Sequence, residues 1–310
     1  MGNMVMKLGM IGYSPNNGHP YSFSSIINGY DSFYLQQSGW DIIEQYLNRK
    51  DKSEFGLHEV QVTHAWTQDR KTTELLTKSC FIPHALDSFH DMIGNVDAVI
   101  IARDDHESHS YLAMPFLKEN IPVFIDKPLT TNLEELKMFI PFMKNALLTS
   151  CSGFRYATEL DCLAEKRSNL GIVKLYRGTI VNDWEKYGIH LLEGFISRLH
   201  SKVIKVKAMD AHNDIMSIYL SDQTLIQIQA IKNIYPLFLM EWMGEKEYFR
   251  AEIKDNFTMF RRMLWHFIRS IRLKLPAINY NSTLEIIYTL IAGNISKQEN
   301  KEVYLDDIRL

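Results

Sequence analysis

Two apolar runs of strand length, separated by enough chain for one helix, constrain this 310-residue sequence most. They are Val96–Ala102 and Ile121–Ile125. Such runs are typical of buried strands, so the segment predicts a β-α-β unit with parallel strands. Asp126-Lys127-Pro128 follows the second run and brings a lysine to the carboxyl edge of the sheet, where α/β folds bind ligands. Lys127 is therefore a candidate for proton chemistry; the alternative is a surface lysine that happens to end a strand.

Strand and helix patterns alternate over the first 150 residues. Strands are expected at 7–12, 58–66, 81–82, 96–102 and 121–126, and helices at 21–28, 69–77, 87–93 and 132–143. This alternation predicts an α/β fold with a doubly wound parallel sheet. Residues 31–56 form an additional element, in which Asp41 can cap a short helix, and which suits a lid or a subunit contact.

The pattern changes near residue 150, where strands begin to follow one another directly. Strands are expected at 175–181, 202–210, 215–220, 224–231, 237–243 and 247–253, and helices at 158–168, 256–273 and 282–295. Short turns between consecutive strands predict an α+β domain with a large open, mostly antiparallel sheet. We place the boundary within 148–153 and divide the chain into domains 1–150 and 151–310.

Composition and charge exclude several classes of protein. The formal charge of −3 provides no basic surface for nucleic acid. No apolar run reaches the ~18 residues of a membrane helix. Cys80, Cys151 and Cys162 lack metal-ligand spacing, so we expect no metal site and a reducing, cytoplasmic setting. The beginning of the sequence has no apolar stretch long enough for a signal peptide.

The turn after the first expected strand is a candidate phosphate-binding loop. It runs from Gly12 to Gly18 and includes Ser14 and Asn17. A turn of this kind offers backbone N–H groups and the positive end of a helix to an anion. Ser14 stands where the second glycine of G-x-G-x-x-G would fall, so the alternative is a β-α turn with no ligand. His19 can bind phosphate or pack at the helix start, and we favour packing.

A dinucleotide-binding sheet needs a polar group at the end of its second strand to meet the adenosine ribose. The candidates are Thr67, Gln68, Asp69 and Arg70. Asp69 suits the 2′-hydroxyl of NAD, whereas Arg70 suits the 2′-phosphate of NADP. Asp69 is equally suited to cap the following helix.

Several segments together resemble the Gfo/Idh/MocA oxidoreductase family, which includes glucose–fructose oxidoreductase and inositol dehydrogenase. The matching motifs follow one another in the family's order. They are Val96–Ala102, His109, Asp126-Lys127-Pro128, Gly153-Phe154-Arg155-Tyr156, Gly171-Ile172-Val173, Gly188-Ile189-His190 with Glu193, and Val303-Tyr304-Leu305. The resemblance implies a Rossmann-type first domain and a second domain that binds substrate and forms oligomers.

The resemblance also implies hydride transfer between NAD or NADP and a hydroxyl-bearing carbon of a sugar, cyclitol or nucleotide sugar. It places Ala102, Arg103, His109, Asp126 and Lys127 at the cofactor. It makes Lys127 and His190 the catalytic residues. Since histidine needs little tuning to act as a base near neutral pH, we assign His190 as the base and Lys127 as the group that polarises the oxygen. The reverse assignment stays open.

The resemblance further implies substrate contacts from a group of second-domain residues. They are Arg155, Tyr156, Lys186, Tyr187 and Glu193. Lys186 stands where the family has an aspartate, and Arg103-Asp104 stands where it has Thr-Pro. A lysine there suits a substrate with an anionic group; the alternative is an exposed lysine.

His190 can also be a satisfied histidine on an apolar helix face. These departures keep a second function open, a non-catalytic dinucleotide-binding regulator or structural homologue, and a third, binding of another nucleotide.

The second-domain sheet has apolar strand residues that suit contact with another subunit. They are Leu225, Ile226, Ile228, Leu237 and Leu239. Such a face usually pairs with a second copy, so we expect a homodimer or homotetramer.

Overall fold

The computed structural model describes residues 5–310, which divide into two compact units. The first contains the chain up to Leu129, Met138–Ser150 and Phe260–Ala277, and the second contains Thr130–Lys137, Cys151–Met259 and Ile278–Leu310. Residues 1–4, on which the expectation about a signal peptide partly rests, lie outside the described residues. Within 5–310 no helix is both long and apolar enough to cross a membrane.

The first unit is built on a six-stranded sheet in the order β3-β2-β1-β4-β5-β6, with all strands parallel. This is the strand order of Rossmann dinucleotide-binding domains, and it confirms the expected doubly wound α/β fold. The strands are β1 (Met6–Ile11), β2 (Val60–Trp66), β3 (His84–Ala85), β4 (Ala98–Ile101), β5 (Val123–Ile125) and β6 (Leu148–Ser150).

The carboxyl ends of the central strands are in register. Ile11 pairs with Trp66 on one side and with Ile101 on the other, and Ile101 pairs with Ile125. The residues that follow these four positions therefore emerge at one edge of the sheet. This register decides which side chains can meet there.

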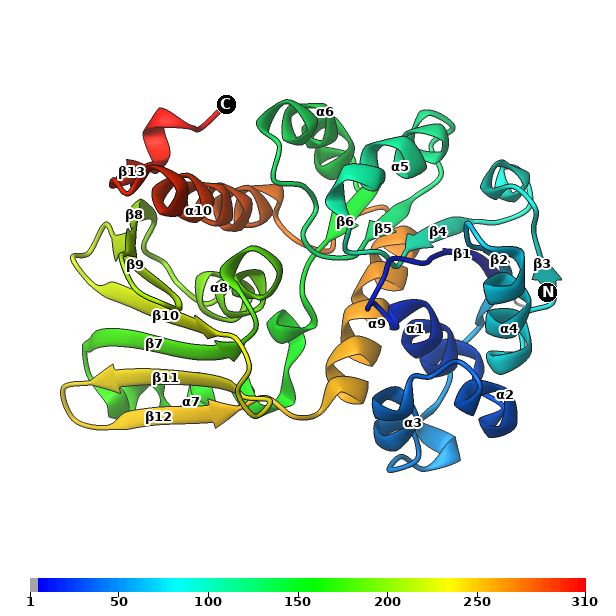
Figure 1. The fold of residues 1–310 in the computed structure, drawn as a ribbon, viewed down its shortest axis with the longest axis horizontal. Coiled ribbons are helices and arrows are strands. Elements are labelled where there is room, and N and C mark those ends of the chain that lie inside the picture. The colour runs from blue at the N-terminus through cyan, green and yellow to red at the C-terminus, as the bar shows by residue number, and fades with distance from the viewer. Residues whose placement is uncertain (1–4) are drawn as a thin grey trace. The chain divides into compact units, whose positions relative to one another are not determined.

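Helices cover both faces of this sheet, as Figure 1 shows. α1 (His19–Asn28) and α4 (Arg70–Ser79) lie on one face, and α5 (His109–Lys118) lies on the other. The central strands are buried on both sides because β4 and β5 are wholly apolar.

A helix that the sequence places in the second domain contributes to the first unit, and the helix expected at 132–143 is divided between the two units. From Phe260 onward, α9 (Asn256–Leu273) packs there, with the Phe267 ring 5.6 Å from that of Phe124. The end of α6 (Leu133–Lys144) from Met138 belongs there too.

Two local expectations for this unit are wrong. The edge strand is His84–Ala85 and not residues 81–82, because Phe81 takes a positive φ of 51° and leaves its ring 53% exposed. The backbone turns there before it reaches the sheet. Asp41 is the first residue of α3 (Asp41–Leu47) and not its cap, which is Trp40. Residues 31–56 also hold α2 (Ser32–Gln36) and a 3-10 turn, Lys52–Glu54.

The second unit is built on a seven-stranded sheet in the order β12-β11-β7-β10-β9-β8-β13. Every pairing is antiparallel except that of β7 with β10, so the expected large, mostly antiparallel sheet is confirmed. The strands are β7 (Val173–Val181), β8 (Val203–Met209), β9 (Asp214–Leu220), β10 (Leu225–Ile231), β11 (Phe238–Gly244), β12 (Tyr248–Glu252) and β13 (Val303–Tyr304).

Two helices, α8 (Ile189–Ile196) and α10 (Tyr280–Glu299), pack against this sheet (Figure 1). A shorter helix, α7 (Leu163–Leu170), lies against β11 and β12. Gly178 of β7 allows α8 to approach closely, because a Cβ atom there would lie 2.8 Å from a methyl group of Leu191.

The apolar residues expected on the open sheet face divide between two faces. Ile226 and Ile228 are fully buried within the unit, on the face of β10 that the helices cover. Leu225, Gln227 and Gln229 alternate with them and are half-buried on the opposite face. Ile226 and Ile228 therefore cannot contact another subunit, because side chains of one strand alternate between faces.

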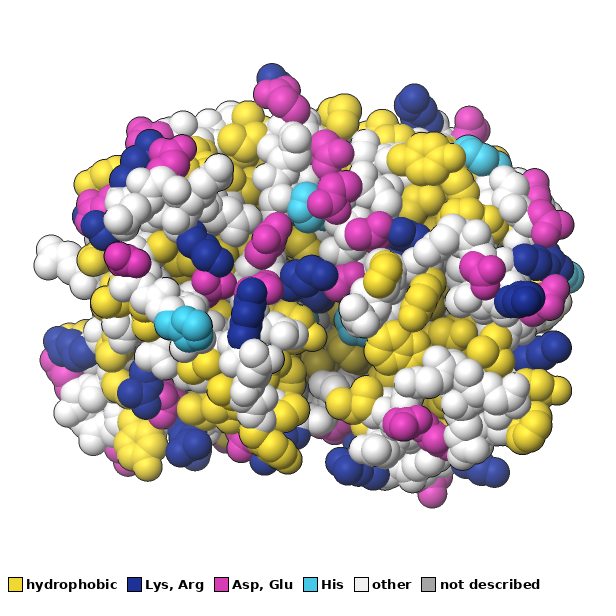
Figure 2. All heavy atoms as spheres, viewed as in Figure 1, with side chains coloured by type: hydrophobic (Ala, Val, Ile, Leu, Met, Phe, Trp, Pro, Cys, Tyr) yellow, Lys and Arg dark blue, Asp and Glu magenta, His cyan; other side chains and the backbone are white. Residues whose placement is uncertain are grey.

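Charged side chains of both signs are mixed on the surface. On the face drawn in Figure 2, Lys and Arg side chains are interspersed with Asp and Glu. That face therefore carries no extended field of one sign.

Candidate active site

Side chains link the loops that follow β1, β2 and β4 at the carboxyl edge. Ser14 Oγ donates to Asp104 Oδ1 at 2.6 Å, which joins the loop after β1 to the loop after β4. The Arg103 guanidinium donates to the Tyr13 carbonyl at 3.0 Å and to Gln68 Oε1 at 2.9 Å. Arg103 also pairs with Asp105 at 2.6 Å, so its charge is already neutralised. These contacts cross the point where the strand order reverses, which is where such sheets bind ligands.

The loop after β1 fits a phosphate group. Gly12 lets the end of β1 approach α1, because a Cβ atom there would lie 2.7 Å from Cγ of Pro20. The N–H groups of Asn16 and Gly18 have no hydrogen-bond acceptor within residues 5–310, and Gly18 is buried at the start of α1. A buried N–H without an acceptor is costly, and a phosphate oxygen at a helix N-terminus would satisfy it.

Asn17 and His19 bind protein atoms. The Asn17 side chain accepts from the His19 N–H at 2.8 Å and donates to Asp126 at 3.2 Å. His19 Nδ1 lies 2.5 Å from Asp126 Oδ2, and the ring stacks on Phe23. The expected phosphate contact of His19 is therefore replaced by this carboxylate, in line with the packing role that we favoured.

Asp126 is a buried carboxylate directly after β5, and it is held ionised. Burial by itself would raise the pKa of its carboxyl, but His19, Lys127 and Asn17 lower that pKa to about 2. Asp126 Oδ1 also accepts the backbone N–H of Lys127 at 2.9 Å. The Lys127 side chain is only 5% exposed, and its peptide bond to Pro128 is cis. Asp126 thus fixes the backbone from which Lys127 projects.

His109 and Ala102 are fully buried. The ring nitrogens of His109 face two carbonyl oxygens, that of Leu129 at 2.9 Å and that of Arg103 at 3.1 Å. Burial lowers the pKa of the His109 imidazole, which favours the neutral form. The side chain thus supports the loop that carries Arg103, and its burial leaves no surface for direct contact with a cofactor. Ala102 contributes only backbone, and its N–H donates to the Ile11 carbonyl.

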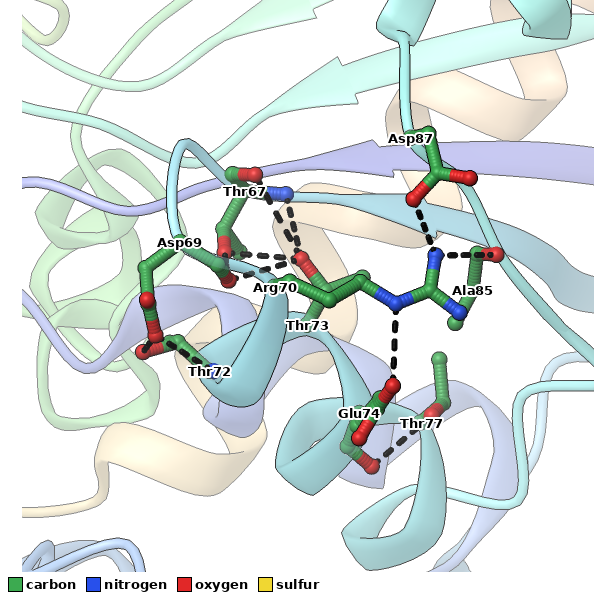
Figure 3. Close-up of polar contacts among 9 residues, drawn as sticks. All are labelled: Thr67, Asp69, Arg70, Thr72, Thr73, Glu74, Thr77, Ala85 and Asp87. Carbon is green, nitrogen blue, oxygen red and sulfur yellow. Dashed lines mark hydrogen bonds and ion pairs between the residues drawn. The ribbon is translucent and has the colours of Figure 1, made fainter.

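Asp69 and Arg70 follow β2, and their side chains point away from each other, as Figure 3 shows. Asp69 is the N-cap of α4, and its Oδ2 accepts from both the N–H and the hydroxyl of Thr72 at 2.8 Å. Those two hydrogen bonds lower the pKa of the Asp69 carboxyl. Thr67 is buried and turned toward the start of α4, where it bonds Thr73.

The Arg70 guanidinium extends the other way (Figure 3). It binds Glu74 at 2.9 Å, Asp87 at 2.7 Å and the Ala85 carbonyl at 3.2 Å. Asp69 therefore presents negative charge at this strand end while Arg70 is engaged by two carboxylates. This arrangement suits a ribose 2′-hydroxyl better than a 2′-phosphate.

In the second unit, His190 lies in the first turn of α8 with only 8% of its surface exposed. Its Nδ1 atom lies 2.6 Å from Ser152 Oγ. The rings of Phe154 and Tyr187 flank the imidazole, with centroids 5.0 and 5.5 Å away. The Ser152 hydroxyl and these two rings thus contribute to holding the imidazole in place.

Arg155 and Glu193 bind each other. Arg155 Nε donates to Glu193 Oε1 in a short ion pair, and its Nη2 donates to Ser282 Oγ at 3.0 Å. Burial raises the pKa of the Glu193 carboxyl, although Arg155 opposes that shift. Glu193 is only 3% exposed, so this pair orders the interior of the unit and the expected substrate contact of Glu193 does not fit. Burial also raises the pKa of the neighbouring Tyr156 phenol.

Lys186 and Tyr187 lie in a single π-helical turn, Trp184–Gly188, which directly precedes α8. Asp183 caps the turn by accepting the Lys186 N–H at 3.0 Å. Trp184 is buried and donates to the Leu290 carbonyl, so it is a core residue. Lys186 is exposed. Turns of this kind are rare and often occur at functional sites.

Residues 38–148 match the family model described as "Oxidoreductase family, NAD-binding Rossmann fold". These residues belong to the Gfo/Idh/MocA oxidoreductase family. The matched segment starts after the loop at Gly12–Gly18, which is where the sequence departs from G-x-G-x-x-G. This domain is of the NAD-binding type. No curated protein sequence matches the chain.

Solved structures of several dehydrogenases resemble the whole chain. The scyllo-inositol dehydrogenase of Lactobacillus casei has a TM-score of 0.77 at 14% identity, over 99% of this chain and 100% of that one. A probable dehydrogenase of Thermotoga maritima has a TM-score of 0.73 at 15% identity, over 98% and 100%. The myo-inositol dehydrogenase of L. casei, in complex with NAD(H) and myo-inositol, has a TM-score of 0.74 at 13% identity, over 97% of each chain. At these identities the likeness shows the shared fold.

Sequence reasoning missed two residues of the candidate site. Ser152 contacts His190 across 38 positions of the chain, and a single serine carries no pattern that would reveal this. Asp104 bonds Ser14 across 90 positions. Its presence beside Arg103, in place of the family's Thr-Pro, was the available signal. Within the described part of the chain, no group of three or more His, Cys, Asp or Glu residues could hold a metal ion.

Proposed function

We propose that this chain is an NAD-dependent dehydrogenase that interconverts a CH–OH group and a carbonyl on a sugar or cyclitol. The main support is Lys127, which follows β5 in a sheet of dinucleotide-binding order and whose backbone is fixed by an ionised Asp126. The related dehydrogenases supply the reaction class.

NAD, when bound, would accept or return the hydride. The N–H groups of Asn16 and Gly18 would hold its phosphates, and the carboxylate of Asp69 would accept from the adenosine ribose. Ser14 and Arg103 would line the cofactor site where the loops after β1 and β4 meet. His109 would hold the loop that carries Arg103 through its contact with the Arg103 carbonyl.

Lys127 and His190 would act on the proton of the substrate hydroxyl. Hydride can leave a carbinol carbon only if the hydroxyl proton is also removed, so the site needs a base and a group that polarises the oxygen. Tyr187 and the exposed Lys186 lie beside His190 in sequence and would contact the substrate. The positive charge of Lys186 suits a substrate that carries a carboxylate or phosphate.

We also propose a homodimer or homotetramer through the uncovered face of the second sheet, where Leu225 and its half-buried neighbours lie. Cys80, Cys151 and Cys162 form no disulfide bond within residues 5–310, which supports a cytoplasmic location.

A non-catalytic dinucleotide-binding function is the second candidate. The Ser14–Asp104 and Arg103–Tyr13 contacts tie together the two loops between which a dinucleotide would lie. A chain that kept the fold for regulation could retain these contacts.

Titration of NADH and NADPH by fluorescence tests the cofactor. Turnover is then measured with NAD and a panel of sugars, uronic acids and cyclitols that includes myo-inositol and scyllo-inositol. Lys127→Ala and His190→Ala should bind NADH normally and lose turnover, while Lys118→Ala, at an exposed position on α5, should retain both. Binding of NADH without turnover on any of these compounds would favour the second candidate. Failure to bind either cofactor would overturn both.

A further inference from the structure

Ser152, which lies outside the family's motifs, forms a buried pair with His190. Ser152 Oγ lies 2.6 Å from Nδ1 of His190, and the two residues are 1% and 8% exposed. Ser152 also caps the 3-10 turn Gly153–Tyr156, since its Oγ accepts the Phe154 N–H at 3.2 Å. The serine is therefore fixed by the backbone, and it can in turn fix the imidazole.

The direction of this hydrogen bond follows from the partners of Ser152. A hydroxyl group has one proton to donate. Within residues 5–310 the Ser152 hydroxyl has one acceptor in reach, His190 Nδ1, because its other contact is the N–H donor of Phe154. A buried hydroxyl whose hydrogen finds no acceptor destabilises the fold. The hydroxyl therefore donates to Nδ1, and neutral His190 carries its hydrogen on Nε2.

We propose that Ser152 is a positioning residue that holds His190 as a hydrogen-bond donor through Nε2. The proposal rests on the proposed dehydrogenase function. It reverses the roles first assigned, since a nitrogen that carries hydrogen cannot accept a proton. His190 donates to the substrate oxygen and keeps its proton. In oxidation the hydroxyl proton would pass to Lys127, and NAD, when bound, would supply the acceptor for the hydride.

The tautomer of His190 can be measured directly. The full-length chain is labelled with ¹⁵N-histidine, and His190→Asn identifies the His190 resonances. The wild-type chain should show the hydrogen on Nε2. Ser152→Ala should give a mixture of tautomers, and Ser152→Thr, which keeps the hydroxyl, should restore the wild-type spectrum. A wild-type hydrogen on Nδ1, or an unchanged spectrum in Ser152→Ala, overturns the proposal.

Kinetics supply the second readout. Ser152→Ala should lower kcat by about 100-fold with an unchanged Kd for NADH, and Ser152→Thr should recover most of the loss. Ser270→Ala is the matched control, because it removes a buried hydroxyl that bonds only the Phe267 carbonyl in α9. Equal losses in the Ala and Thr variants contradict the positioning role. Absence of turnover in the wild-type chain with the expected tautomer counts against the proposed function alone.

Discussion

Nδ1 of His19 lies 2.5 Å from Oδ2 of Asp126, across 107 positions of the chain. This contact joins the start of α1 to the residue that precedes Lys127. It therefore ties the loop that would hold phosphate to the backbone that carries the candidate catalytic lysine.

Asp126 should make stability depend on pH in acid. Its folded pKa of about 2 is below the unfolded value of 3.8, so its stabilisation is complete above the unfolded pKa and is lost as pH falls through about 2. The difference corresponds to about 2 kcal/mol. In urea unfolding, the stability gap between wild type and Asp126→Asn should narrow between pH 5 and pH 2.

Two further variants complete that test. Asp91→Asn removes an exposed carboxylate and should show a gap that is small at every pH. In His19→Gln the Asp126 carboxyl should titrate at a higher pH than in the wild-type chain, because the variant lacks a partner that lowers the Asp126 pKa. A stability difference between wild type and Asp126→Asn that does not change with pH would contradict the lowered pKa of Asp126.

Asp69 should set the preference for NADH over NADPH. Hydrogen bonds from Thr72 lower the pKa of the Asp69 carboxyl, so it is ionised at neutral pH and repels a 2′-phosphate. Asp69→Asn keeps an oxygen for the helix cap but removes the charge, and it should reduce the ratio of the two affinities about 10-fold. Glu119→Gln removes an exposed carboxylate at the end of α5, away from Arg70, and is the control. Tighter binding of NADPH by the wild-type chain would refute this role.

Arg103 should matter for cofactor affinity through the loops it holds. Arg103→Ala removes its donors to the Tyr13 carbonyl and Gln68, and should weaken NADH binding about 10-fold because hydrogen bonds from charged groups are each worth ~1.5–3 kcal/mol. Arg49→Ala, at an exposed position after α3, should leave binding unchanged. Stronger NADH binding in Arg103→Ala would instead mean that this network obstructs the site.

The uncovered face of the second sheet should control assembly. Light scattering at micromolar concentrations should show a dimer or tetramer for the wild-type chain. Leu225→Lys places a charge on the uncovered face and should give a monomer of unchanged fold. Ile226→Val alters the neighbouring residue on the covered face and should not change the mass. A monomeric wild-type chain would rule out this interface.

The sequence determined most of the secondary structure, because apolar periodicity is a local property. The strand that leads to Lys127, the helix Asn256–Leu273 and the six consecutive strands of the second sheet all follow from patterns within short windows. The same patterns placed Lys127 at the carboxyl edge, since a parallel sheet has only one such edge. The prediction of a strand at residues 81–82 was wrong because two apolar residues are too few to distinguish a strand from a turn.

Only the tertiary structure decided which side chains became partners. His19 was left open between phosphate binding and packing and bonds Asp126, and Glu193 was assigned to substrate and bonds Arg155. Ser152 orients His190 although nothing in its sequence neighbourhood indicates it. Each of these pairs joins residues tens of positions apart. Their meeting depends on strand register and helix packing, which no local window of sequence contains.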